Sequence, residues 1–141
     1  MTVGYQGRDA SELINALFDA GVDVLVDVRL TPLSRKPGLS KTRLAEALRE
    51  RGIEYLHLPQ LGNPRDNRDA YRNADAAAVA RFREVLSSPG GAGAVKYLRD
   101  LAERSVIALM CFERDHGQCH RNQVVEAITA TDSAEICVTH L

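Results

Sequence analysis

Short apolar runs alternate along the chain with longer stretches in which apolar residues recur at helical spacing. The runs are rich in Val, Ile and Leu, and their length and β-branched content predict strands. The segments of this kind are 2–5 (TVGY), 22–28 (VDVLVDV), 53–58 (IEYLHL), 106–110 (VIALM) and 135–141 (EICVTHL). The run at 106–110 is apolar throughout, which is typical of a strand that is buried on both faces.

The stretches between these runs predict helices, because their apolar residues repeat every three or four positions. Ser11 and Ser40 are expected to cap the first two helices, and Gly21 and Gly52 to follow their last turns. Further helices are expected at 74–86, at 92–104 and, after the fourth strand, up to about residue 130.

This alternation of strands and helices is typical of a parallel sheet with helices on both faces. We therefore expect a three-layer α/β/α fold with a mainly parallel, five-stranded, Rossmann-like sheet of order 3-2-1-4-5. With 141 residues, the chain has about the length of one domain, so residues 1–141 are expected to form a single α/β domain. The polar segment 59–73 has few apolar side chains that could pack in a core, and it is interpreted as a lid or a mobile loop.

Composition excludes several classes of protein. Hydrophobic residues make up 45% and charged residues 26% of the chain, which is ordinary for a globular protein, and no apolar run approaches the roughly 18 residues of a membrane span. The first residues lack the pattern of a signal peptide, so a cytoplasmic location is expected. A net charge of -1 does not favour a surface devoted to nucleic acid. The 3 cysteines are expected to be thiols.

The highest density of reactive side chains lies at 111–121 (CFERDHGQCHR), directly after the apolar run. This segment is expected to join a strand to a helix, and such loops bind ligands at the carboxyl edge of parallel sheets. The loops that follow the other strands should meet it there. They contribute Tyr5, Asp27, Arg29 and Gly62.

Four separated stretches resemble a family of bacterial and archaeal proteins known only as domain of unknown function 488. They are the opening residues 2–5, the strand 24–29 with Arg35, Pro37 and Gly38, the segment 55–62 (YLHLPQLG), and CFERD at 111–115 with CHR at 119–121. The resemblance spans the chain. It implies the same fold and places the site at these motifs, while the family name assigns no reaction.

Arginines in the converging loops indicate an anion site. Arg29 directly follows a buried strand, Arg35 lies in the loop after it, and Arg121 is expected in the first turn of a helix, whose free amides favour an anion. We expect these arginines to bind a phosphate or carboxylate, with Tyr5, Gly62 and His120 also lining the site. Pairing of the arginines with Asp27 or Glu113 is the equal alternative.

Glu113 and Asp27 are the acid/base candidates. If Glu113 lies behind apolar residues such as Phe112, its pKa should rise. Asp27 lies within a buried strand, where a role as a cap or as an arginine's partner is the more common one.

Cys119 is the candidate nucleophile, because a helix N-terminus and nearby cations lower the pKa of a thiol. Cys111 and Cys137 are interpreted as core residues. Cys111, Cys119 and His120, with His116 or Glu113, also admit a zinc site, but the C-x7-C-H spacing is unlike familiar ligand patterns, so no metal and no cofactor is expected.

The sequence thus predicts a small enzyme that acts on an anionic, phosphate-bearing ligand, such as a nucleotide or a nucleic-acid fragment, with Glu113, Asp27 and Cys119 as catalytic candidates. A non-catalytic module that binds a nucleotide, nucleic acid or partner protein is the first alternative, and a metal-dependent hydrolase the second. No GxGxxG, P-loop or GxSxG motif is present.

Overall fold

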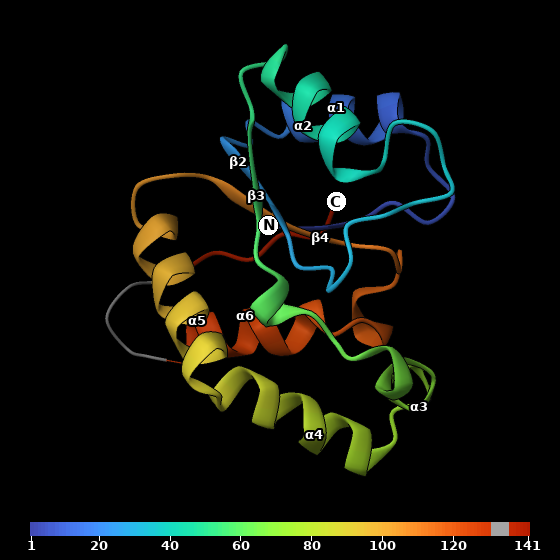
Figure 1. The fold of residues 1–141 in the computed structure, drawn as a ribbon. Helices are drawn as coiled ribbons and strands as arrows, with labels where there is room; N and C mark the ends of the chain where they lie inside the picture. Colours follow the sequence, from blue (N-terminus) through green and yellow to red (C-terminus); the bar gives the residue numbers. More distant parts are fainter. Residues whose placement is uncertain (131–135) are drawn as a thin grey trace.

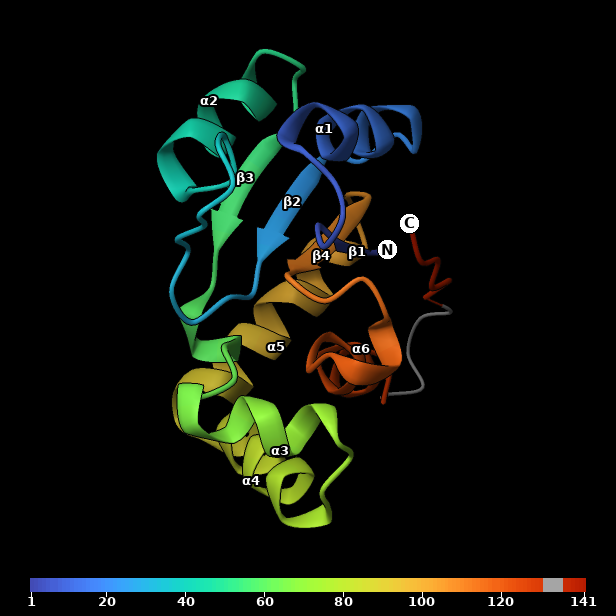
Figure 2. The same cartoon turned by 90° about the vertical axis from the view of Figure 1, so that its right-hand side faces the viewer.

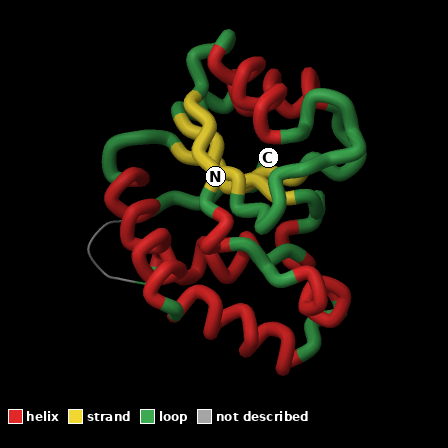
Figure 3. The backbone as a smooth tube through the Cα atoms, in the orientation of Figure 1, coloured by secondary structure: helices red, strands yellow, loops and turns green. Residues whose placement is uncertain are grey.

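A computed structural model describes residues 1–130 and 136–141. Its centre is a parallel sheet whose four strands are β1 (Thr2–Gly4), β2 (Val24–Asp27), β3 (Glu54–His57) and β4 (Ile107–Cys111), in the order β1-β4-β2-β3. Every strand pair is parallel, and Val26 faces Leu109 on one side and Leu56 on the other. Figure 3 shows the strands side by side at the middle of the molecule.

Helices cover both faces of this sheet (Figures 1 and 2). Leu25, Ala108 and Met110 pack on one face with α1 (Ala10–Asp19) and α2 (Lys41–Arg49). The alternate strand residues pack on the other face with α4 (Ala76–Ser87), α5 (Pro89–Ala102) and α6 (Arg121–Thr129). The predicted α/β class with a parallel sheet is therefore confirmed.

The prediction of five strands in the order 3-2-1-4-5 is wrong. β4 lies between β1 and β2, so β1 does not neighbour β2. β4 has five residues, all buried, whereas β1 has only three, and the longer apolar strand gains more from a central position. Of the expected last strand, Glu135 lies outside the described residues, and residues 136–141 form a single bridge, between Thr2 and His140.

Three helices begin at different residues than predicted. α4 begins at Ala76 and not at residue 74, because the Asp75 side chain caps it by accepting the amide of Ala78. Asp9, not Ser11, caps α1, since its side chain accepts the amide of Glu12 while the Glu12 side chain accepts the amide of Asp9. α5 begins at Pro89, three residues before Ala92, because Ser88 caps it and proline suits a first turn. Ser40 occupies the N-cap position of α2, as predicted, but its hydroxyl bonds to the Ser34 backbone and does not cap the helix amides.

The segment 59–73, predicted to be a lid or a mobile loop, contains regular structure. It forms 3-10 turns at Pro59–Leu61 and Arg65–Asn67, followed by the short helix α3 (Arg68–Arg72). The buried Asn67 amide holds it in place by donating to the Asn63 side chain and to the Ala78 carbonyl. The apolar Leu61 and Tyr71 also pack in the core, so buried polar and apolar side chains together fix this segment, although its sequence has no apolar periodicity.

None of the helices in the described parts of the chain has both the length and the apolar character that a membrane span requires.

Candidate functional site

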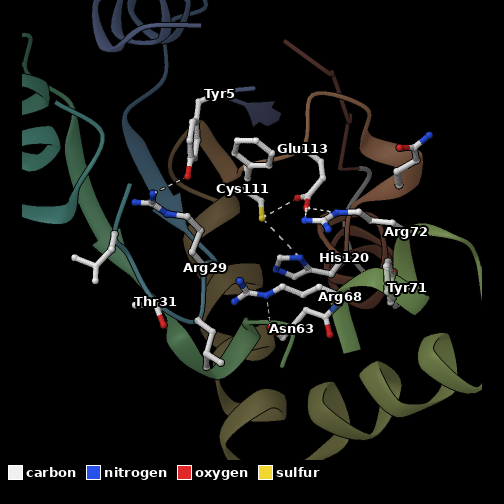
Figure 4. Close-up of a pocket in the computed structure, with 14 residues that line it drawn as sticks. Tyr5, Arg29, Thr31, Asn63, Arg68, Tyr71, Arg72, Cys111, Glu113 and His120 are labelled. Atoms are coloured by element: carbon white, nitrogen blue, oxygen red, sulfur yellow. Dashed lines mark hydrogen bonds and ion pairs between the residues drawn. The ribbon is translucent and has the colours of Figure 1, made fainter. Parts of the chain in front are cut away.

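A pocket of about 190 Å³ opens at the carboxyl edge of the sheet. Side chains from four loops and from α3 surround it, and Figure 4 shows them converging. The lining residues are Tyr5, Arg29, Leu30, Thr31, Leu33, Asn63, Arg68, Tyr71, Arg72, Cys111, Phe112, Glu113, Gln118 and His120. The edge of the sheet expected to carry a site therefore carries a pocket.

One wall of the pocket is built on a buried ion pair. Asp27, fully buried at the end of β2, accepts from the Arg29 guanidinium at 2.6 Å. Tyr55 donates its hydroxyl to the same carboxylate at 2.5 Å, and Arg29 donates to the Tyr5 hydroxyl at 3.1 Å. Burial alone would lower the pKa of Arg29, but the hydrogen bond and charge of Asp27 raise it, so the guanidinium stays charged. Asp27 does not line the pocket; its contacts are those of an arginine's partner.

Glu113 lies on the opposite wall, where β4 has ended. Its Oε1 accepts from Nε and Nη2 of Arg72 at 3.1 and 2.9 Å, and its Oε2 accepts from the Cys111 thiol at 3.3 Å. The expected rise of its pKa is wrong. Burial raises the pKa of Glu113. Hydrogen bonds from its own backbone, from Arg72 and from the cysteines lower this pKa by more than burial raises it, so the carboxylate is ionised at neutral pH.

This arrangement makes stability depend on pH. Because the folded-state pKa of Glu113 is lowered, its contribution is present above the unfolded pKa of about 4.3 and is lost as pH falls through the folded-state value. We expect Glu113→Gln to lower the free energy of unfolding by about 1 kcal/mol at pH 7 and to lose less as the pH falls below 4. Urea unfolding of the wild type and the variant, at pH 7 and at a pH below 4, measures this difference in the free energy of unfolding. Glu46→Gln, exposed on α2, is the control, and a difference between the Glu113 and Glu46 variants that is independent of pH would contradict it.

His120 lies at the floor of the pocket, between two thiols. Its Nε2 is 3.1 Å from the Val28 carbonyl, which can only accept, so Nε2 carries the hydrogen and Nδ1 holds a lone pair. Nδ1 faces the Sγ atoms of Cys111 at 3.7 Å and Cys119 at 3.8 Å. The Phe82 ring packs edge-on against the imidazole and fixes its plane.

Both thiols are buried in the core, and they differ in how they lie relative to the pocket. Cys119 is 1% exposed and does not line the pocket, whereas Cys111 does. The expected lowering of the Cys119 pKa is also wrong: burial and the nearby Cys111 raise the pKa of this thiol well above its usual value, although His120 opposes them. Desolvation of a thiolate therefore outweighs the helix N-terminus.

Three of the other expected ligand residues lie outside the pocket lining. Arg35 is exposed on the loop after β2. Arg121 is 1% exposed and donates to the Glu113 carbonyl at 2.6 Å and to the Cys119 sulfur at 3.2 Å. Gly62 packs so closely on Leu30 that a Cβ there would lie 2.5 Å from the Leu30 backbone. The structure thus gives Arg121 and Gly62 supporting positions behind the site.

Sequence reasoning missed Arg68, Arg72 and Asn63, which lie on the pocket wall formed by the segment 59–73. The density of Arg and Asn in that segment was the available signal. Arg68 donates through Nε to the Asn63 carbonyl at 3.2 Å. Within the described residues, its two Nη groups have no hydrogen-bond partner.

The fold and the pocket define a small α/β protein with a pocket at the carboxyl edge of a parallel sheet, lined by arginines, a glutamate and a thiol. The family model described as domain of unknown function DUF488 matches residues 9–128, and the chain belongs to this family. Searches of curated proteins and of solved structures gave no match. The resemblance read from the sequence motifs is therefore confirmed.

Proposed function

We propose that this protein is an enzyme that binds a small phosphate-bearing anion in the pocket, with Arg68 as the main ligand-binding cation. The observation that carries the proposal is the free end of Arg68. Its Nε is fixed by the Asn63 carbonyl, which leaves the Nη groups free to bind a ligand. A guanidinium of this kind binds two oxygens of a phosphate at once.

The charges around the pocket support an anionic ligand. Arg29, Arg68 and Arg72 line it, against one lining carboxylate, that of Glu113. Arg29 is balanced by Asp27, and Arg72 by Glu113 and Asp69. Arg68 is therefore the lining arginine that has no carboxylate partner among the described residues, and a bound anion would supply one.

The volume of the pocket limits the size of the ligand that it can enclose. A volume of about 190 Å³ is below the roughly 300 Å³ at which pockets for whole drug-sized ligands begin. It suits a phosphate with the first few atoms attached to it. The phosphate end of a nucleotide, a sugar phosphate or a nucleic-acid strand shares this chemistry, with the remainder extending into solvent.

The reactive groups beside this cation favour an enzyme over a binding module. Glu113, ionised and partly exposed to the pocket, can accept a proton from an attacking group. Cys111 and His120 line the same pocket and lie within 3.7 Å of each other. A module that only held an anion would not need these groups beside it.

A titration of the wild type and Arg68→Ala with inorganic phosphate, a nucleoside monophosphate and a sugar phosphate tests the proposal. We expect a thermal shift in the wild type and at least about a tenfold loss of affinity in the variant, since losing a charged hydrogen bond costs about 1.5–3 kcal/mol. The control is Arg65→Ala, exposed in the preceding turn and outside the pocket.

Equal affinity in the Arg68 and Arg65 variants, or no shift with any phosphate compound, would contradict the proposal. Binding that is accompanied by no turnover of any phosphate ester, at any pH from 5 to 9, would leave the binding module as the correct function.

A further inference from the structure

The structure points to a zinc site on the floor of the pocket, with Cys111, Cys119 and His120 as ligands; we propose that the protein binds one Zn²⁺ there. Their ligand atoms all lie within 4.8 Å of one another, and all three residues are buried. This inference goes beyond the proposed function, because metal binding requires none of the pocket arginines.

The distances fit a single metal ion. With Zn–S of about 2.3 Å and Zn–N of about 2.0–2.1 Å in a tetrahedron, neighbouring ligand atoms are roughly 3.5–3.8 Å apart. Nδ1 of His120 lies 3.7 Å from the Cys111 sulfur and 3.8 Å from the Cys119 sulfur. The two sulfurs lie within 4.8 Å of each other, so they would have to approach by at most about 1 Å to share an ion.

The histidine is oriented as a metal ligand. The Val28 carbonyl accepts the Nε2 hydrogen and so directs the Nδ1 lone pair toward the sulfurs. Ligating histidines almost always bond their other nitrogen in this way. A histidine that served packing alone would not need its lone pair between two thiols.

The surroundings balance the charge of a thiolate pair. Zn²⁺ offsets two thiolates, and the remaining charges are those of Arg121 and Glu113. Arg121 donates to the Cys119 sulfur at 3.2 Å, and its buried Nη1 has no hydrogen-bond partner among the described residues. Zinc would displace the two thiol protons on binding.

The chain supplies three ligands, and Glu113 adjoins the fourth position. Its Oε2 lies 3.3 Å from the Cys111 sulfur, and Glu113 lines the pocket. Three protein ligands with one further position are typical of zinc sites that are open to a substrate or water. The C-x7-C-H spacing, which argued against zinc, is bridged by the 3-10 turn at His116–Gln118 that brings Cys119 back to the end of β4.

The test uses untagged protein that has been reduced and whose thiols have been shown to be free. This protein is equilibrated with Zn²⁺ and then dialysed. Elemental analysis should find about one zinc per chain in the wild type and in Cys137→Ser, whose thiol is exposed. Cys119→Ser and Cys119→Ala should bind at least about tenfold more weakly. Co²⁺ in place of zinc should give the intense visible bands of a tetrahedral site and sulfur-to-metal absorption in the near ultraviolet.

Reduced wild-type protein that binds no zinc, or that gives no sulfur-to-cobalt absorption, would overturn the inference, and this result needs no variant to fold. Equal zinc binding by the Cys119 and Cys137 variants would do the same. Arg68→Ala should bind zinc normally, so a failure of the phosphate proposal leaves the zinc result intact, and the reverse also holds.

Discussion

Asp27→Asn should destabilise the protein by about 3–5 kcal/mol, the cost of removing one partner of a buried ion pair. Asp27 is fully buried and Arg29 is 6% exposed, so water cannot replace the lost charge at the guanidinium. The asparagine also loses one of two acceptor oxygens that serve Arg29 and Tyr55. Because a domain of this size has only about 5–15 kcal/mol of stability, the effect should be obvious in urea unfolding.

The matched control is Asp66→Asn. Asp66 also pairs with an arginine, Arg81, but both side chains are exposed to solvent. We expect no measurable change, since water screens such pairs. If Asp27→Asn lowers the free energy of unfolding by less than about 1 kcal/mol, the Arg29 guanidinium must bond to water or to another acceptor. The ion pair would then not hold the pocket wall in place as described.

Gly4→Ala should destabilise the protein by about 3 kcal/mol, at the upper end for overpacking a core. A Cβ at residue 4 would lie 1.9 Å from the carbonyl oxygen of Glu113 and 2.8 Å from Cα of Arg114. These are backbone atoms, so the loop that follows β4 would have to move. Gly4 also pairs with Cys111 in the sheet, so the variant should weaken zinc binding as well.

Gly93→Ala provides a control of opposite sign. Gly93 lies inside α5, and nothing is within 4 Å of a Cβ placed there. Alanine should therefore stabilise the helix by about 0.5–1 kcal/mol. Urea unfolding of both variants measures the contrast. A Gly4→Ala protein as stable as the wild type would mean that the contact between β1 and the Glu113 loop is not close.

The sequence predicted the four strands of the sheet, because each coincides with a short, largely apolar run between turns, but the fifth expected strand is not part of the sheet. It could not predict their order, because β1 and β4 are both apolar and buried, and either of them could lie beside β2. The carboxyl edge as the place of the site followed from topology alone. Tyr5, Arg29, Glu113 and His120, which the sequence assigned to this edge of the sheet, line the pocket.

The errors within the site have a common physical cause. Sequence shows where a residue lies along the chain, but not how deeply it is buried. We expected a lowered pKa for the Cys119 thiol because it precedes a helix, but its burial raises the pKa. We expected burial to raise the pKa of Glu113, but its hydrogen bonds lower the pKa. Arg68 was missed because α3 lies in a segment with no apolar periodicity.

The central claim is that the loops of the carboxyl edge form one anion-binding pocket around Arg68. Crystals grown with tungstate, which is a phosphate analogue with strong anomalous scattering, test it most directly. The account predicts an anomalous peak within hydrogen-bonding distance of the Arg68 Nη groups, beside Glu113 and His120. A peak only at the exposed Arg35, or at surface arginines outside the pocket, would contradict it.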